Sequence, residues 1–459
     1  MDRILQFLSD YAISLTYEKL PAEVVHQVKR LMIDSLGCAM GGYLEEPPKI
    51  ARAHALEVTA ARGATVLGTS HRTAAELAAF ANGVMVRYLD FNDALGGNGH
   101  PSGNIPAVLA AAEYASADAR TAITGIVLAY EVQNRIADAR RPPRRDWDHA
   151  VYMVLGSAAG AGKALGLTHG QMANALALAA TTSVALGQTR RGTLSMWKGS
   201  AEGNSSRNGV FAALLARRGM TGPGEAFEGV SGFIKHVSGP LELLPFGGDG
   251  QPFEIEASRF KYFPTDYEAQ VAAQPAVELH KLLTGRVEEI EKVVVDAYGG
   301  AIFMAADSPD KWNPTTRETA DHSLPYVLSI ALTKGTVGLD DFTEERIRNP
   351  QIHALMQKIE VREKEEYTRA FPEATCFRIE LITKSGEEHV REIRYGKGHP
   401  KNPMSDQEIE AKFRRLAEPV LGPGQVNMIL NRLWHLEEVR DLQEILNLFE
   451  LQSRSTARK

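Results

Sequence analysis

Apolar residues recur every three or four positions over much of the chain, which is the spacing of one face of an α-helix. After Pro21, a favourable first residue of a helix, Val24 and Leu31 follow this spacing. Thr73 and Glu76 have the spacing of a capping box and predict the start of another helix. Further helices are predicted at 105–115, 121–136, 151–167, 171–186, 198–218, 267–283, 405–421, 426–434 and 442–451. Many of these segments are rich in Ala and Gly, which let helices pack closely, so we expect an all-helical bundle.

The pattern changes after Arg286, where β-branched residues such as Val287, Ile290 and Val293 predict a strand. Further extended segments are predicted at 358–362, 377–383 and 389–395, the last two joined by the turn Lys384-Ser385-Gly386. A helix is predicted at 323–334 between them. We therefore expect a mainly α protein, in which a smaller α+β domain at 268–400 is inserted into an all-helical domain formed by 1–267 and 401–459.

Composition supports this division and limits the possible partners. The 459 residues exceed the size at which one hydrophobic core usually divides. The formal net charge of -6 argues against a nucleic-acid partner, and no apolar run reaches the roughly 18 residues of a membrane helix. The N-terminal segment also lacks the apolar core of a secretory signal. Cys38 and Cys376 are the only cysteines and fall in different predicted domains, so we expect no disulfide framework and a cytoplasmic protein.

The segment most informative for chemistry is 87–113, a loop between two predicted helices. It combines polar side chains with a glycine-rich turn: Asp90, Asn92, Asp93, His100, Gly96, Gly97 and Gly99. Glycine lets the backbone approach a ligand closely, and the flanking helices would hold the polar side chains in place. A histidine near a carboxylate can act as a general acid or base. The alternative is a solvated loop in which Asp93 or Ser102 only caps a helix.

Other candidates lie at predicted helix starts. His149 follows an Arg- and Pro-rich connection at 140–147 and could be a second imidazole of a site or a surface residue that caps a helix. Lys198 also begins a predicted helix, with Arg190 upstream. A cation is disfavoured beside the positive end of a helix unless an anion lies between them, so a carboxylate pocket is one interpretation. Solvated surface charge is the other.

Two more polar clusters lie near the predicted domain junction and before the helix at 323–334: Lys261, Tyr262 and Glu268 in the first, and Arg317, Asp321 and His322 in the second. Ligand clefts often form between domains, which favours a role for the first cluster. In the second, Asp321 and Ser323 could simply be the N-terminal cap of the helix.

A metal site is a further interpretation, because Asp90, Asp93, His100 and His149 could supply oxygen and nitrogen ligands. The chain has no His-x-x-x-His or Cys-x-x-Cys spacing to support one. It also has no phosphate loop and no Gly-x-Gly-x-x-Gly unit after a predicted strand. We therefore expect neither a metal nor a nucleotide cofactor.

Several blocks, in order along the chain, resemble the MmgE/PrpD family, which includes 2-methylcitrate dehydratases, cis-aconitate decarboxylase and iminodisuccinate epimerase. These blocks are Leu89-Asp90-Phe91-Asn92-Asp93 with His100-Pro101-Ser102, Trp147-Asp148-His149, Met196-Trp197-Lys198-Gly199, Lys261-Tyr262-Phe263-Pro264 and Ala320-Asp321-His322-Ser323. The resemblance covers nearly the whole chain. It implies a helical domain built from both chain ends, an inserted α+β lid domain, a homodimer, and metal-free acid/base chemistry on a di- or tricarboxylate substrate.

The resemblance also assigns roles by position. The catalytic residues would be Asp90, His100, His149, Lys198 and Lys261, and the substrate-binding residues would be Asn92, Asp93, Arg190, Tyr262, Glu268 and His322. In a dehydratase, one imidazole would remove the proton alpha to a carboxylate, while the lysines would offset charge on the enolate-like intermediate. We expect His100 with Asp90 to be the main acid/base pair.

Three positions depart from the family pattern. Ala94 replaces a common Thr, Gly103 replaces the Asp of 2-methylcitrate dehydratase-like members, and Glu268 replaces a His. The first hypothesis is a cofactor-free lyase that dehydrates a 2-methylcitrate-like hydroxylated di- or tricarboxylate. The departures favour a second, an epimerase of the iminodisuccinate type, and a decarboxylase is third. A carboxylate-binding homologue without turnover is the non-enzymatic alternative, but it would not need the Asp90 and His100 pair.

Overall fold

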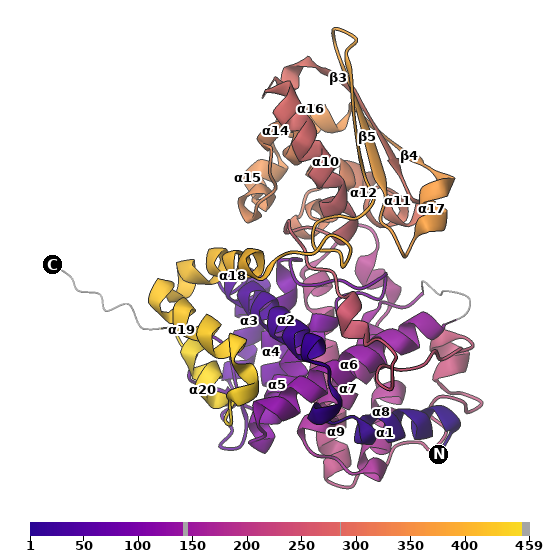
Figure 1. Ribbon diagram of the computed structural model, residues 1–459, viewed down its shortest axis with the longest axis vertical. Coiled ribbons are helices and arrows are strands. Elements are labelled where there is room, and N and C mark those ends of the chain that lie inside the picture. The colour runs from indigo at the N-terminus through magenta and orange to yellow at the C-terminus, as the bar shows by residue number, and fades with distance from the viewer. Residues whose placement is uncertain (141–145, 285, 452–459) are drawn as a thin grey trace, which may run out of the picture.

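The computed structural model describes residues 1–140, 146–284 and 286–451. A helical region occupies the lower part of the molecule and an α+β region the upper part (Figure 1). Within the described residues, none of the helices combines the length and apolar character needed to cross a bilayer. The prediction of a mainly α protein with a smaller α+β part is confirmed.

The helical region contains a two-stranded hairpin, β1 and β2, and helices from both ends of the chain. Its elements are α1 (Arg3–Ser14), α2 (Ala22–Gly41), α3 (Glu46–Leu56), β1 (Ala64–Thr65), β2 (Arg72–Thr73), α4 (Ala75–Tyr88), α5 (Asn104–Ala115), α6 (Ala119–Ala139), α7 (Ala150–Ala164), α8 (His169–Thr182), α9 (Ala201–Arg217), α18 (Asp406–Leu421), α19 (Pro423–Trp434) and α20 (Gln443–Leu446). The C-terminal helices lie against the N-terminal ones (Figure 1). At one contact, a Cβ on Gly37 of α2 would lie 3.0 Å from the ring of Phe413 of α18.

Glycines set the close helix packing that the sequence predicted, and one such contact positions the site. A Cβ on Gly83 of α4 would lie 2.7 Å from the Cα of Gly203 of α9, so a larger residue would push these helices apart. The same holds for Gly125 of α6, where a Cβ would lie 2.9 Å from the carbonyl oxygen of Gly160 of α7. Since Asp90 follows α4 and Lys198 precedes α9, the Gly83 contact holds the segments carrying these two side chains together.

The α+β region contains a four-stranded sheet in the order β4-β3-β5-β6, with β3 and β4 parallel and the other pairs antiparallel. Its elements are α10 (Tyr267–Leu283), β3 (Ile290–Ala297), α11 (Gly299–Ala305), α12 (Pro309–Trp312), α13 (Arg317–Ala320), α14 (Leu324–Lys334), α15 (Glu344–Ile347), α16 (Pro350–Met356), β4 (Ile359–Glu363), α17 (Glu365–Ala370), β5 (Phe377–Thr383) and β6 (Glu388–Ile393). Alternate residues of β5 are buried, because α10 packs on one face of the sheet. The strands predicted at 358–362 and 377–383 are confirmed, and the limits of the two domains stay predictions.

Local predictions failed at two element starts. Thr73 is not a helix cap, because it pairs with Ala64 in the β1–β2 hairpin and α4 begins after Ala74 without a side-chain cap. Val287 lies in a 3-10 turn, so the predicted strand begins only at Ile290. In both cases the local residue pattern was compatible with the prediction, and pairing with the neighbouring strand of a hairpin, or a turn, decided the outcome. By contrast, Ser323 does cap α14, accepting a hydrogen bond from the backbone N–H of Tyr326.

Candidate active site

Asp90 is the centre of a buried charge cluster. It follows α4 with a left-handed backbone (φ 50°), which turns the chain out of the helix. One carboxylate oxygen, Oδ1, lies 2.9 Å from Nη1 of Arg87 and accepts a hydrogen bond from Lys261, while Oδ2 lies 2.9 Å from Nζ of Lys198. Burial opposes ionisation, but the charges of Arg87, Lys198 and Lys261 outweigh it and hold the pKa of Asp90 well below its ordinary value. Asp90 is therefore an anion that holds three cations together.

Asp321 brings the α+β region into this cluster. Lys198 donates a hydrogen bond of 2.9 Å to Asp321, so its ammonium group lies between carboxylates of both regions. His322 lies 2.6 Å from Asp321 through Nδ1 and 3.3 Å from Asp90 through Nε2. Burial, aided by the charge of Lys198, lowers the pKa of His322 to about 3, so the neutral ring donates to Asp321 through Nδ1–H. Asp321 is thus a member of the cluster and not the helix cap considered from the sequence.

His100 is a neutral imidazole whose Nε2 makes no hydrogen bond within the part of the chain that the structure describes. Its Nδ1 lies 2.6 Å from the backbone oxygen of Asp93. Because a carbonyl oxygen can only accept, Nδ1 carries the proton and Nε2 keeps its lone pair. Burial and the charge of Arg87 hold the pKa of His100 well below its ordinary value. Nε2 is 3.9 Å from Asp90, so the acceptor that orients this ring is the Asp93 carbonyl and not, as expected from the sequence, the Asp90 carboxylate.

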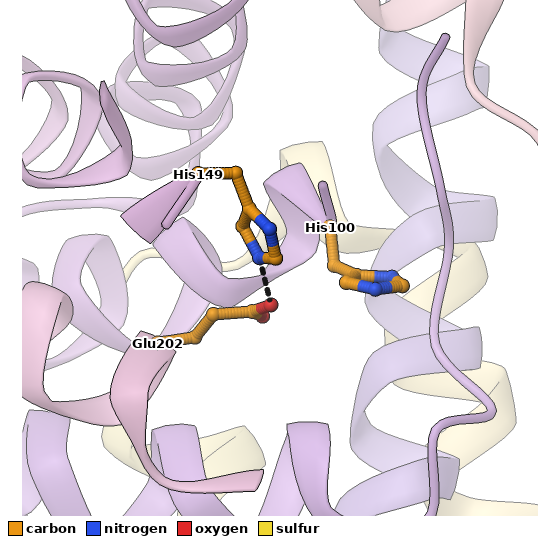
Figure 2. Close-up of side chains that lie close together, drawn as sticks. All are labelled: His100, His149 and Glu202. Atoms are coloured by element: carbon orange, nitrogen blue, oxygen red, sulfur yellow. Dashed lines mark hydrogen bonds and ion pairs between the residues drawn. The ribbon is translucent and has the colours of Figure 1, made fainter. Parts of the chain in front are cut away.

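His149 contacts a carboxylate that the sequence reasoning missed, Glu202 (Figure 2). Nε2 of His149 lies 2.7 Å from Oε1 of Glu202, and the rings of His149 and His100 have centroids 5.6 Å apart. Arg87 donates to the same Oε1 at 2.8 Å. Burial would raise the pKa of Glu202, but Arg87 and His149 outweigh it, and the pKa is lowered. An acidic residue in the first turn of a helix was the only sequence signal, and it is typical of any helix start.

Arg190, predicted to bind substrate, is already paired with protein groups. Its Nε donates to Asp148 at 2.7 Å and its Nη1 donates to the backbone oxygen of Lys198 at 3.1 Å. Its Nη2 lies 3.3 Å from Nε2 of His149 and 3.8 Å from Glu202. Arg190 therefore connects the segment before α7 with the segment before α9. The Arg- and Pro-rich connection expected at 140–147 lies mostly outside the described residues.

Four of the remaining predicted binding residues lie outside the charge cluster. Asn92 donates to the hydroxyl of Ser102 at 2.9 Å, and Asp93 accepts from the N–H of Ser102 and from the hydroxyl of Tyr130. These bonds brace the loop that carries His100, and the binding roles predicted for Asn92 and Asp93 stay predictions. The other two are Tyr262, which is 41% exposed, and Glu268, which accepts a hydrogen bond of 2.8 Å from Tyr298.

Two glycines of the loop are required by the neighbouring side chains. Gly99 has a positive φ of 86°, and a Cβ there would lie 2.2 Å from the ring of His149. A Cβ on Gly103 would lie 2.6 Å from Cε of Met153 and 3.1 Å from Oε2 of Glu202. The carboxylate of Glu202, which belongs to α9, thus lies beside the space that the Asp side chain common at position 103 in 2-methylcitrate dehydratase-like members would enter. At the departure in position 94, the contact is made by the backbone: Ala94 pairs with Arg259, which lies two residues before Lys261.

The charged groups of the cluster balance one another. The cations Arg87, Arg190, Lys198 and Lys261 are in contact with the carboxylates Asp90, Asp148, Glu202 and Asp321. Lys311 of α12 is a further, buried lysine, and its backbone oxygen accepts a hydrogen bond from Ser323, next to His322. Within the described ranges, its ammonium group makes no hydrogen bond or ion pair. Burial lowers the pKa of Lys311, while the charge of Asp266 opposes this shift and that of Lys198 adds to it.

Among the described residues, two groups of side chains have the ligand types of a metal site: His100, His149 and Glu202, and Asp90, Asp321 and His322. In the first group, Oε1 of Glu202 already accepts from Arg87 and faces Arg190, and in the second, Lys198 and Lys261 contact the carboxylates. A divalent cation would have to displace these ammonium and guanidinium groups or lie against them, and that repulsion disfavours metal binding. The lysines and arginines instead supply the positive charge of the site.

Comparisons with known proteins cover most of the chain. The MmgE/PrpD N-terminal domain matches residues 6–243 and the MmgE/PrpD C-terminal domain matches residues 263–436. Cis-aconitate decarboxylase of Homo sapiens is 27% identical over 94% of this chain and 91% of its own length. The mitochondrial 2-methylcitrate dehydratase of Yarrowia lipolytica is 27% identical over 94% of this chain and 86% of its own length.

A third relative, 2-methylcitrate dehydratase of Salmonella typhimurium, is 28% identical over 78% of this chain and 77% of its own length. A decarboxylase and a dehydratase are both lyases, so the predicted enzyme class, a lyase, is confirmed. The resemblance noted in the sequence blocks extends over both regions of the structure. The chain belongs to the MmgE/PrpD family.

Proposed function

We propose that this lyase is a cofactor-free dehydratase that acts on a hydroxylated di- or tricarboxylate, such as 2-methylcitrate, by removing the proton alpha to a carboxylate. The observation that carries the proposal is the state of His100. Its ring is neutral, its Nδ1–H is fixed by the Asp93 carbonyl, and its Nε2 lone pair is free beside the Asp90 cluster. A neutral imidazole of this kind is the form that a general base requires.

The reaction divides between the two imidazoles. Nε2 of His100 takes the alpha proton, and the electrons of the broken C–H bond form an enolate whose charge Lys198 and Lys261 offset. When the enolate collapses to an alkene, the C–O bond breaks and His149, in its protonated form, gives a proton to the departing hydroxyl, which leaves as water. The ring centroids are 5.6 Å apart, a separation that lets adjacent carbons of one substrate reach both imidazoles.

Lys311 is the proposed binding group for a substrate carboxylate. The other cations near the site already contact protein carboxylates, whereas the ammonium group of Lys311 has no such contact within the described residues. A buried ammonium without an anion is unfavourable, so a substrate carboxylate at this position would stabilise it. Asn92, Asp93, Arg190, Tyr262, Glu268 and His322 stay predicted binding residues, and the homodimer and the cytoplasmic location stay predictions.

An epimerase is the second candidate, and the charge balance of the site favours it. A tricarboxylate would bring three negative charges to a cluster whose cations are already paired, whereas a dicarboxylate with an imino or amino nitrogen brings fewer. The first step would be the same proton removal by His100. Return of a proton to the opposite face, without loss of hydroxide, would then invert the carbon.

Proton NMR in deuterium oxide distinguishes these candidates. The purified protein is incubated with 2-methylcitrate, citrate, cis-aconitate and iminodisuccinate in separate samples. New alkene signals from a hydroxylated substrate support the dehydratase, whereas deuterium at the alpha carbon without an alkene contradicts it for that compound and supports the epimerase. Loss of carbon dioxide from cis-aconitate would instead identify a decarboxylase.

A His100→Asn variant is the control for the same panel. If the protein is an enzyme, the His100→Asn variant loses turnover but still binds the ligand. A carboxylate-binding protein shows no turnover in either form.

A further inference from the structure

We propose that Glu202 is a positioning residue that fixes the proton of His149 on Nε2, and so makes Nδ1 the nitrogen that exchanges protons with the substrate. The inference rests on the proposed acid/base role of His149. Its geometric basis is the 2.7 Å contact between Nε2 and Oε1 of a fully buried carboxylate (Figure 2). At this separation an ionised carboxylate can only accept, so the ring must donate through Nε2–H.

The other groups around His149 would select the opposite tautomer. Nη2 of Arg190 lies 3.3 Å from Nε2, and a guanidinium group can only donate, so it would place the lone pair on Nε2. Oδ1 of Asp148 lies 3.8 Å from Nδ1 and would attract a proton there. His100 contributes a neutral ring with its centroid 5.6 Å away. The shorter contact to Glu202 overrides Arg190 and Asp148, so the tautomer of His149 depends on Glu202.

Arg87 explains why one oxygen of Glu202 is aimed at His149. Its Nε donates to Oε1 at 2.8 Å while its Nη1 contacts Asp90 at 2.9 Å, so one guanidinium group orients both carboxylates. Oε1 faces His149, Arg87 and, at 3.8 Å, Arg190, whereas Oε2 has no hydrogen-bond partner within the described residues and lies toward Gly103. Figure 2 shows Nδ1 of His149 on the side of the ring toward His100. This arrangement leaves Nδ1 available for the substrate.

The experiment is nitrogen-15 NMR of the full-length protein labelled in histidine, in which the shifts of the two ring nitrogens report which one carries the proton. A His149→Asn variant assigns the signals. We expect Nε2–H in the neutral ring of the unaltered protein, while the protonated form that donates to the leaving group carries its second proton on Nδ1. If His149 carries its proton on Nδ1 instead, the proposal is overturned without any variant at position 202 having to fold.

Two substitutions at position 202 separate the effect of a hydrogen-bond acceptor beside Nε2 of His149 from the effect of the negative charge of Glu202. In Glu202→Gln, the Arg87 Nε–H requires an oxygen at the Oε1 position, so the amide oxygen faces His149 and the Nε2–H tautomer is kept. In Glu202→Ala, Arg190 becomes the nearest polar group to Nε2, and we expect the proton to move to Nδ1. For Ala we expect kcat to fall about 100-fold or more with KM changed less than about threefold, and for Gln a fall within about tenfold. An unchanged tautomer in the Ala variant contradicts the proposal.

A carboxylate introduced at position 103 is expected to restore the tautomer of His149 in the Glu202→Ala variant. Because Oε2 of Glu202 lies 3.1 Å from the Cβ position of residue 103, an aspartate there reaches the space that Glu202→Ala vacates, at the cost of moving the flexible end of Met153. The double variant Gly103→Asp with Glu202→Ala is expected to recover the Nε2–H tautomer, and failure to recover it counts against the geometry. Glu113→Gln is the matched control, since this buried glutamate contacts Thr65 and no histidine. The tautomer is measured without substrate, so a silent substrate panel with the expected shifts would count against the proposed function and leave the assignment of the His149 proton to Nε2 standing.

Discussion

Two buried aspartates of the same loop are expected to respond in opposite directions when each is replaced by asparagine. Asp90 contacts three cations, whereas the side-chain carboxylate of Asp93, within the described residues, hydrogen-bonds only to Ser102 and to the hydroxyl of Tyr130. Removing one partner of a buried ion pair typically costs about 3–5 kcal/mol, because the other charge is left uncompensated. Asp90→Asn leaves more than one buried cation uncompensated. We therefore expect this variant to lose at least this much free energy of unfolding at neutral pH. At about 2.1 cal/mol/K of unfolding entropy per residue, a chain of 459 residues loses roughly 1 °C per kcal/mol, so the corresponding fall in Tm is roughly 3–5 °C.

Asp93 differs because folding disfavours its ionised form. Burial raises the pKa of Asp93 to about 6, compared with about 3.9 in an unfolded chain. A raised pKa in the folded state contributes stability that is fully present below about pH 3.9 and is lost as pH rises through about 6, in total roughly 3 kcal/mol. Asp93→Asn removes this loss, since an amide does not ionise. At pH 7 we therefore expect a Tm that is unchanged or higher.

The pH dependence adds a second test of the same reasoning. The lowered pKa of Asp90 means that its stabilising contribution is present above about pH 3.9 and is lost only as pH falls through the folded-state value. The difference in Tm between the unaltered protein and Asp90→Asn should thus be constant from pH 7 to pH 5 and shrink below pH 4. Circular dichroism melts at one fixed scan rate measure this. If Tm falls equally for both variants at pH 7, or falls by less than about 2 °C for Asp90→Asn, the description of Asp90 as the centre of the cluster is refuted.

Three further predictions concern the reaction. The pKa of His100 is held well below its ordinary value of about 6.5, so this base stays neutral in mild acid. In rate measurements, the fall of kcat/KM on the acidic side should therefore lie below pH 6. A fall near pH 7 would contradict this prediction. Lys311→Met should raise KM about tenfold or more with a smaller change in kcat, whereas the exposed Lys384→Met, measured in parallel, should change neither. Dialysis against EDTA should leave kcat unchanged, since lysine and arginine side chains supply the positive charge of the site, and activity restored only by an added metal would disprove that assignment.

Much of the fold follows from local patterns in the chain. Helices α6, α7 and α10 lie where apolar residues recur at helical spacing, and the strand β5 lies where buried and polar residues alternate. These elements could be predicted because each period depends only on residues within a few positions of one another. The start of α4 could not, since Thr73 is drawn into pairing with Ala64.

The sequence by itself determined the helical and α+β parts and the loop that carries Asp90 and His100, because periodicity, glycine content and clustering of polar residues are local properties. Only the tertiary structure decided which groups meet. Lys261 reaches Asp90 across 171 positions, and Glu202 reaches His149 across 53. It also decided that His100 is oriented by a backbone carbonyl and that Arg190 is already paired with Asp148. Contacts at such separations depend on how closely helices such as α4 and α9 pack, and the hydrogen-bonding and charge state of each side chain follows from the neighbours that this packing supplies.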